Sequence, residues 1–129
     1  MIKYSDSVEN ITPGMLNGFF EGWKKPQTTK NHLKILKNSD YIILAIDTDN
    51  SRVIGFITAL ADNVQAAFIP LLEVLPEYRC KGIGSKLVSR MLEKLKDIPA
   101  IDLTCEPELQ KFYMRFGMVP SAGMIIRDC

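Results

Sequence analysis

The stretch Leu72-Glu-Val-Leu-Pro-Glu-Tyr-Arg-Cys-Lys-Gly-Ile-Gly-Ser-Lys-Leu-Val88 joins an apolar run to an amphipathic helix through a glycine-rich turn. Gly82 and Gly84 have no Cβ, so the backbone there can turn tightly and approach a ligand closely. The first N–H groups of the helix lack partners inside it, and with the positive end of the helix dipole they suit a phosphate or pyrophosphate. Three residues add positive charge: Arg79, Lys81 and Lys86. This stretch predicts an anion site.

The composition limits the partners of the chain. Its 129 residues are enough for a single core, and we expect one domain over residues 1–129. The net charge is +1, from 16 basic and 15 acidic residues. A chain this close to neutral has no overall field that recruits nucleic acid or an anionic membrane, so we expect neither partner. Any anion binding must therefore be local.

The chain shows no pattern typical of export. Its start is polar, and its longest apolar run, Val53 to Ala61, is too short to span a bilayer, so a cytoplasmic protein is expected. Cys80, Cys105 and Cys129 are odd in number and widely spaced, which favours reduced thiols over disulfides. The one histidine, His32, is expected on a helix surface, and no paired Cys/His spacing indicates a metal site.

The first third of the chain is predicted as strand, helix, helix. A short strand is expected over Ile2 to Tyr4, and Thr12-Pro13 has the chemistry of an N-cap followed by proline in the first helical turn. Apolar residues then recur at helical spacing on a helix that ends by Pro26: Met15, Leu16, Phe19, Phe20 and Trp23. A second helix is expected from Thr28 or Thr29 to about Lys37.

The middle of the chain is predicted as strands. Tyr41 to Ile46 and Val53 to Leu60 are typical of an antiparallel hairpin with a polar loop. A third run covers about Gln65 to Leu75 and contains Pro70. Because proline cannot donate to a sheet ladder, Pro70 predicts a bulge or break in this strand.

The last third is predicted to alternate helices and strands. The clearest helix starts at Gly82, and a short strand is expected over Ala100 to Thr104. A second helix begins at Pro107 and ends at Gly117, a common residue at helix C-termini. Val119 to Arg127 is predicted as a final strand.

Two motifs resemble those of the GCN5-related N-acetyltransferases, the GNAT family. Arg79-Cys-Lys-Gly82-Ile-Gly84 is similar to the family's cofactor motif of Arg or Gln, two residues, Gly, one residue, and Gly or Ala. Leu109-Gln-Lys-Phe-Tyr-Met-Arg-Phe-Gly-Met118 resembles its second landmark, a helix carrying Phe-Tyr before a closing Gly. The order of the elements also matches over nearly the whole chain.

The resemblance implies an α/β fold of the α+β kind. Its sheet is mixed and mostly antiparallel, with six or seven strands and about four helices, and it is splayed between the fourth and fifth strands, where acetyl-coenzyme A binds. The main chain of Val74 and Leu75 is implied to pair with the pantetheine arm, and the amides from about Lys81 to Lys86 to hold the pyrophosphate. The cofactor-binding residues implied are Val74, Leu75, Arg79, Cys80, Lys81, Gly82, Ile83, Gly84, Ser85 and Lys86.

The sequence departs from the family pattern at two positions. Cys80 lies where glycine is common, which predicts a tight turn or a thiol near the pyrophosphate. Glu106 lies where many relatives have an asparagine that contacts the cofactor, and a carboxylate there does not suit a phosphate neighbour.

The implied reaction is direct transfer of an acetyl group from acetyl-coenzyme A to a primary amine. An alkyl amine has a pKa of about 10, so a base must take its proton. Glu73 is the candidate base, with a water relay as the alternative. Tyr113 corresponds to the tyrosine that protonates the leaving thiolate, whose pKa is about 8.5, and the Val74 N–H is the candidate donor to the oxyanion.

Other interpretations of these residues stay open at this point. Tyr113 lies on the apolar stripe of its helix and also suits a core position, and Glu73 also suits solvent or a lysine partner. Glu21 is more typical of a surface carboxylate, and Trp23 is expected at the edge of the acceptor site. The alternative function is a non-catalytic acyl-CoA-binding sensor or interaction module. The acceptor, a small-molecule or peptide amine, is not identified, and the terminal strand is compatible with a homodimer.

Overall fold

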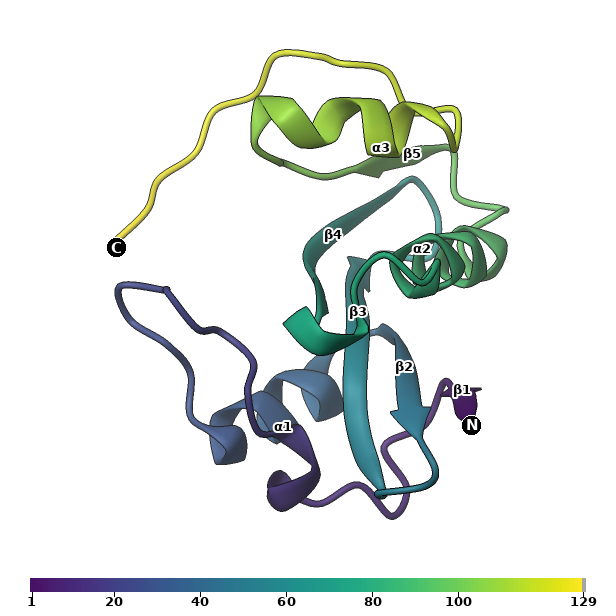
Figure 1. Ribbon diagram of the computed structural model, residues 1–129. Coiled ribbons are helices and arrows are strands. Elements are labelled where there is room, and N and C mark those ends of the chain that lie inside the picture. Colours follow the sequence, from purple (N-terminus) through teal and green to yellow (C-terminus); the bar gives the residue numbers. More distant parts are fainter. Residues whose placement is uncertain (129) are drawn as a thin grey trace.

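The computed structural model describes residues 1–128, and its centre is a five-stranded sheet in the order β1-β2-β3-β4-β5 (Figure 1). The first four strands pair antiparallel, and β5 pairs parallel to β4. The strands are β1 (Ile2–Ser5), β2 (Tyr41–Asp47), β3 (Arg52–Ala61), β4 (Ala66–Val74) and β5 (Ala100–Asp102). The predicted mixed α/β class is confirmed, with fewer strands within residues 1–128 than the six or seven expected.

Three α-helices and three short 3-10 helices lie within residues 1–128. The α-helices are α1 (Thr29–Asn38), α2 (Ile83–Lys94) and α3 (Gln110–Met114), and the 3-10 helices are η1 (Pro13–Leu16), η2 (Pro76–Tyr78) and η3 (Pro107–Leu109). The predicted cap of α1 is confirmed, because the Thr28 hydroxyl accepts the N–H of Asn31 at 3.1 Å. None of these helices has the length and apolar character needed to cross a membrane.

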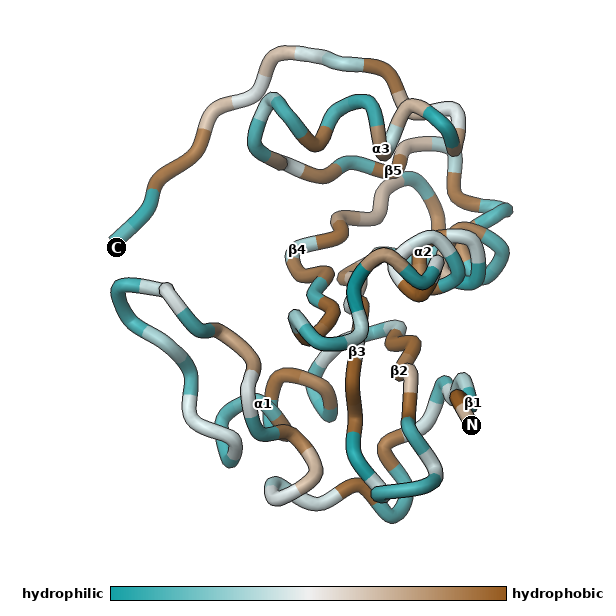
Figure 2. The backbone as a smooth tube through the Cα atoms, viewed as in Figure 1, coloured by the Kyte–Doolittle hydropathy of each residue, from teal (hydrophilic) through white to brown (hydrophobic). Residues whose placement is uncertain are grey.

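Helices cover both faces of the sheet (Figure 1). On one face Phe56 of β3 packs edge-on against Phe19, from the segment between η1 and α1. On the other face Gly55 lies under α2, and a Cβ on it would meet Leu87 at 3.2 Å. Because successive strand residues point to opposite faces, β3 is apolar along most of its length, as its hydropathy shows (Figure 2).

The helix expected from Pro13 to about Pro26 is wrong beyond its first turn. It ends with η1 at Leu16, and residues 17–22 form turns. Three alternate residues have left-handed backbone: Gly18 at φ 97°, Phe20 at 66° and Gly22 at 81°. A left-handed residue cannot continue a right-handed helix. The apolar residues at helical spacing therefore lie in a folded loop.

The surface position expected for His32 is wrong as well. Its side chain is 1% exposed and lies among the rings of Phe19, Phe20 and Phe56. Neither ring nitrogen has a hydrogen-bond partner in the described chain, and burial lowers the pKa of His32 from 6.5 to about 4. The loop that replaces the expected helix folds over α1 and so buries this histidine.

Pro70 marks an irregularity in β4, as predicted. The pairing of β3 with β4 runs from Thr58 opposite Leu71 to Leu60 opposite Phe68, so β4 contains one extra residue at this point. Pairing of β4 with β5 stops at Phe68. Within residues 1–128 the rest of β4, up to Val74, therefore pairs with no strand on that side, and the expected splay between the fourth and fifth strands is confirmed.

The final strand expected over Val119 to Arg127 is wrong. Residues 119–128 form no strand and run as an extended segment away from α3 (Figure 1). Arg127 donates to the Thr104 hydroxyl at 3.3 Å, and Lys25 pairs with Asp128 at 2.9 Å. A sequence rich in strand-forming residues becomes a strand only beside a neighbour that supplies hydrogen bonds, and no strand within residues 1–128 pairs with this segment.

Candidate active site

The opening between β4 and β5 exposes main-chain groups of β4. In an antiparallel pair, alternate residues direct their N–H and C=O groups toward the partner strand. Leu75 donates its N–H to Ile54 at 2.9 Å, so the N–H of Val74 points away from β3 and into the opening. The C=O of Leu75 accepts the N–H of Tyr78. Of the two residues expected to pair with a pantetheine arm, Leu75 makes main-chain bonds within the protein, whereas Val74 keeps a free N–H.

The glycine turn begins α2. Gly82 is the N-cap with φ 80°, a left-handed conformation that glycine adopts without strain. The N–H of Lys86 bonds to the Gly82 C=O at 3.1 Å, so the amides of Ile83, Gly84 and Ser85 precede the first bond of the helix. These three amides suit an anion. The amide of Lys86, which was expected to contribute, is already bonded to the Gly82 C=O.

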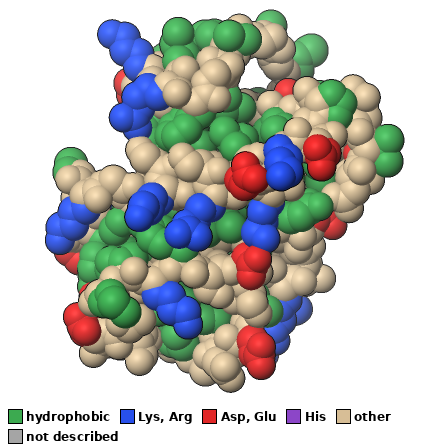
Figure 3. All heavy atoms as spheres, turned by 90° about the vertical axis from the view of Figure 1, so that its right-hand side faces the viewer, with side chains coloured by type: hydrophobic (Ala, Val, Ile, Leu, Met, Phe, Trp, Pro, Cys, Tyr) green, Lys and Arg blue, Asp and Glu red, His purple; other side chains and the backbone are tan. Residues whose placement is uncertain are grey.

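The basic side chains of the motif are engaged with neighbours around the turn. Arg79 donates from Nε to the Val74 C=O at 3.0 Å. The Lys81 ammonium lies over the Tyr78 ring, and the Lys86 ammonium lies over Tyr4 of β1. Basic and acidic side chains are interspersed on the neighbouring face of the molecule (Figure 3). The basic side chains of the motif therefore lie on a surface of mixed charge, in keeping with the net charge of +1.

Cys80 holds a strained position in this turn. It is exposed and has φ 63°, a conformation that places a Cβ too close to the following carbonyl oxygen. This geometry explains why glycine suits the position and confirms the tight turn expected there. Glu106, the other departure, is exposed at the start of η3.

We expect Cys80→Gly to be more stable than Cys80→Ala by about 0.5 to 1 kcal/mol. Both variants remove the thiol, but only glycine relieves the left-handed strain, and part of this gain is offset by the greater freedom of glycine in the unfolded chain. Urea unfolding of the two variants measures the difference. Equal free energies of unfolding would show that the turn carries no strain at this residue.

Glu73 lies on the face of β4 that meets the loop after η1. Its side chain is half-buried, and both carboxylate oxygens accept the N–H of Phe20, at 3.1 and 3.2 Å. Burial raises the pKa of Glu73, and the negative charge of Glu21 raises it further. The Phe20 N–H and the positive charge of Arg79 lower it. The carboxylate is thus only partly exposed to solvent, and within residues 1–128 it forms no ion pair with a lysine.

Trp23 and Glu21 lie in the same loop. Trp23 is 48% exposed and packs edge-on against Phe20, and Glu21 is exposed. The loop therefore brings a carboxylate and an aromatic ring to the side of β4 that carries Glu73. This side is suited to an amine, because carboxylates attract its cationic form and an exposed indole presents a π face to it.

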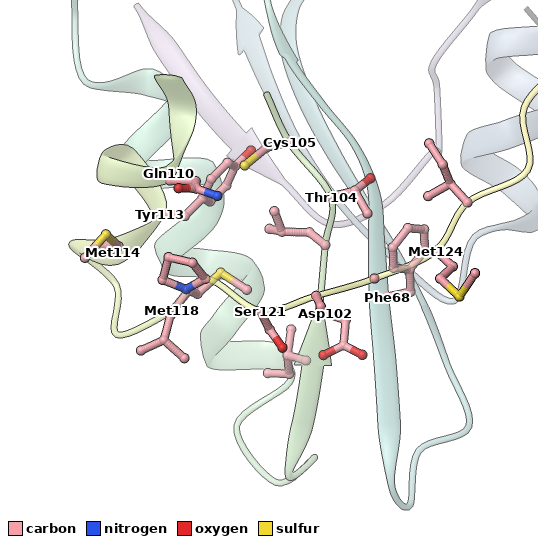
Figure 4. A pocket seen from close by; sticks show the side chains of 17 residues that line it. Phe68, Asp102, Thr104, Cys105, Gln110, Tyr113, Met114, Met118, Ser121 and Met124 are labelled. Atoms are coloured by element: carbon pink, nitrogen blue, oxygen red, sulfur yellow. The ribbon is translucent and has the colours of Figure 1, made fainter. Parts of the chain in front are cut away.

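Tyr113 lies on α3 and lines a cavity of about 550 Å³ between β5, α3 and the segment after Met118 (Figure 4). Burial, followed by the neighbouring Cys105, raises the pKa of Tyr113 above its usual 10. Because this pKa lies well above 7, the phenol is protonated at neutral pH. Its hydroxyl makes no hydrogen bond within residues 1–128, so its proton is available to a ligand.

The base and acid candidates come from different elements around the opening. Glu73 is on β4 and pairs across the sheet with Phe56, on the face of the loop and α1. Tyr113 is on α3, whose Phe112 lies 3.7 Å from a Cβ placed on Gly84 at the start of α2. Arg115 fixes this contact by donating to the Ser85 hydroxyl at 2.7 Å. The arrangement suits a reaction at the open edge of β4.

Two contributors were missed by sequence reasoning. Phe20 was interpreted only as a core residue, and its main chain contacts Glu73; Arg115, which ties α3 to the glycine turn, was not singled out. The glycines at 18 and 22 were a signal for a folded loop, since glycine is unfavourable inside a helix. Nothing local in the sequence indicates the Arg115 contact, which joins residues 30 positions apart.

Comparison with known proteins agrees with this geometry. A family model described as the acetyltransferase (GNAT) family matches residues 9–118. The crystal structure of a candidate acetyltransferase from Deinococcus radiodurans R1 matches at 40% identity and a TM-score of 0.94, over 98% of this chain and 87% of that chain. An acetyltransferase of the GNAT family from Streptococcus pneumoniae TIGR4 matches at 27% identity and a TM-score of 0.75, over 99% and 98% of the two chains.

A curated relative is longer than this chain. The uncharacterized N-acetyltransferase ycf52 of Pyropia yezoensis is 31% identical over 102 residues, which cover 76% of this chain and 58% of the relative. The chain therefore spans less than two thirds of the length of this protein. The shared part includes the strand, the glycine turn and the helix on which the site is built.

Proposed function

Because this chain belongs to the GNAT family of acetyltransferases, we propose that it transfers the acetyl group of acetyl-coenzyme A directly to a primary amine. One observation carries the proposal: the open edge of β4, with the free N–H of Val74, leads to the free amides at the start of α2. An extended pantetheine arm suits the first and a pyrophosphate suits the second. A cytoplasmic location stays a prediction.

The chain supplies a base on the acceptor side. Glu73 takes a proton from the ammonium group of the acceptor, which then attacks the thioester carbonyl as a neutral amine. Because burial raises the pKa of Glu73, its carboxylate is a better base than a solvated glutamate. Its position on the same side as Glu21 and Trp23 supports this role.

The chain also supplies a hydrogen-bond donor for the thioester carbonyl and a proton donor for the sulfur. The Val74 N–H stabilises the negative charge that develops on the carbonyl oxygen. As the new C–N bond forms and the C–S bond breaks, the Tyr113 hydroxyl gives its proton to the leaving sulfur. The ammonium proton remains on Glu73 until solvent removes it. The nitrogen loses a second proton as the amide forms; this proton passes to solvent, and solvent reprotonates Tyr113. Each turnover therefore releases one proton net, and the charges balance.

Thiol release from acetyl-coenzyme A, measured over a panel of amines, tests the proposal. The panel contains N-terminal and lysine peptides, polyamines, amino acids, aminoglycosides and arylamines. We expect acetyl-coenzyme A to raise Tm, since 100 times Kd stabilises by about 2.7 kcal/mol, and at least one amine to accelerate thiol release. Stabilisation without turnover on any amine would favour a non-catalytic sensor, and no stabilisation would exclude this cofactor.

We expect Tyr113→Phe to lower kcat by about tenfold and to leave the Tm increase with acetyl-coenzyme A unchanged. The loss is moderate because a thiolate with a pKa of about 8.5 leaves fairly well without a proton. Tyr41→Phe is the matched control, since the Tyr41 hydroxyl bonds to Asn63 at an exposed position. Unchanged kcat in Tyr113→Phe would show that this residue is only a core tyrosine.

A further inference from the structure

We propose that Phe20 is a positioning residue, whose main-chain N–H orients the Glu73 carboxylate and keeps it ionised for the transfer; this inference rests on the function proposed above. The sequence predicted Glu73 as the base but no group that positions its carboxylate. The structure adds a donor 53 positions away in the chain, whose N–H lies 3.1 and 3.2 Å from the two carboxylate oxygens. The nearly equal distances centre the carboxylate on one N–H.

The backbone of the loop creates this donor. Gly18, Phe20 and Gly22 have positive φ, and the residues between them do not, so the conformation alternates along the segment. Such alternation turns successive N–H groups toward one side and forms small concavities that bind anions. Here the anion is a side chain of the same protein. A regular helix over the same residues would direct the Phe20 N–H along its own axis instead.

The side chain of Phe20 holds the strained backbone in place. A bulky residue with φ 66° is uncommon and persists only where its surroundings fix it. The Phe20 ring is 2% exposed, and its centroid lies 4.9 Å from that of His32 and 5.0 Å from that of Trp23. Buried aromatic packing therefore stabilises the conformation that aims the N–H at Glu73.

Three groups besides burial act on the charge of Glu73. The Phe20 N–H and the Arg79 guanidinium, from the turn after β4, favour the carboxylate, and Glu21, from the loop, opposes it. Arg79 is also bonded to the Val74 C=O. The Phe20 N–H is the one of the three that contacts the carboxylate, so its removal should raise the pKa of Glu73 while burial stays the same.

An amide-to-ester replacement removes this donor and little else. Incorporation of phenyllactic acid at position 20 replaces the N–H by an ester oxygen and keeps the ring. The same substitution at position 19 is the matched control, because Phe19 is buried in the same aromatic cluster and its N–H does not contact Glu73. Titration of the Glu73 side-chain carboxyl by 13C NMR, assigned with Glu73→Gln, gives the pKa without any requirement for activity.

The ester at position 20 is expected to raise the pKa of Glu73, and the ester at position 19 to leave it unchanged. At pH values below the pKa of Glu73, and with the amine of the panel that reacts fastest, the ester at position 20 should lower kcat/KM about tenfold relative to the unmodified protein. The ester at position 19 should not change it. The same pKa of Glu73 in the two ester-containing proteins would overturn the proposal. A raised pKa with an unchanged rate profile would keep the role of Phe20 and contradict Glu73 as the base, which separates the two hypotheses.

One further measurement does not depend on the ester folding. In the unmodified protein the amide proton of Phe20 should titrate at the midpoint of Glu73, and this titration should vanish in Glu73→Gln. A Phe20 amide that is insensitive to the titration of Glu73 would contradict the proposal.

Discussion

Glu73→Gln is expected to lower kcat/KM by about 10²- to 10⁴-fold, the usual contribution of a general base. Glutamine keeps the size of the side chain, and its carbonyl oxygen can still accept the Phe20 N–H, so the loop should stay in place. Only the ability to take a proton is lost. The measurement is thiol release from acetyl-coenzyme A with the amine that gives the fastest reaction.

The pH dependence gives an independent check on this variant. In the unmodified protein, kcat/KM should fall as the pH drops through the pKa of Glu73, which burial places above its ordinary value of 4.5. Glu73→Gln should lose this acid limb. Glu93→Gln is the matched control, because its carboxylate is exposed near the end of α2 and pairs with Lys96 at 3.2 Å, and it should change kcat/KM by less than about threefold. An intact acid limb in Glu73→Gln would point to a water relay.

Acidification from pH 7 to pH 5 is expected to lower the free energy of unfolding by about 2 kcal/mol through His32 alone. The folded protein holds this histidine neutral, with a pKa of about 4, whereas in the unfolded chain it titrates near 6.5. Between these values the unfolded state binds a proton that the folded state does not. The stability is therefore present above pH 6.5 and is lost as the pH falls toward 4.

Urea unfolding of the unmodified protein and of His32→Leu at both pH values measures this effect. Leucine is apolar and removes two ring nitrogens that have no hydrogen-bond partner in the described chain, so the variant should be at least as stable at pH 7. Between pH 7 and pH 5 the free energy of unfolding of this variant should fall by about 2 kcal/mol less than that of the unmodified protein. The same pH dependence in both proteins would show that His32 gains a partner or solvent when it is charged.

The parts of the fold that depend on local chemistry were predictable. Thr28 caps α1, Gly82 begins α2, and Pro70 disturbs β4, because each acts on its own backbone and its nearest neighbours. The hairpin of β2 and β3 follows from two apolar runs joined by a polar turn. The resemblance to the GNAT family rested on motifs of the same local kind, and the family match agrees with it.

The errors fall where partners distant in the chain decide the structure. The apolar spacing of residues 13–23 suits a helix or a folded loop, and packing against Phe56 and His32 fixes the loop. His32 is buried because that loop covers α1. The segment from Val119 has strand-forming residues, and within the described chain no strand forms hydrogen-bonded pairs with it. In each case the pattern gives a tendency and the tertiary contacts choose the outcome.

The sequence by itself determined the glycine turn, the helix after it and the positions of Glu73 and Tyr113, since these depend on residue type and spacing. Only the tertiary structure decided that α3, which carries Tyr113, is tied to the glycine turn and that the N–H of Phe20 contacts the Glu73 carboxylate. The reason is physical. A hydrogen bond across 53 positions depends on how the sheet, loop and helices pack, and no local pattern encodes that packing.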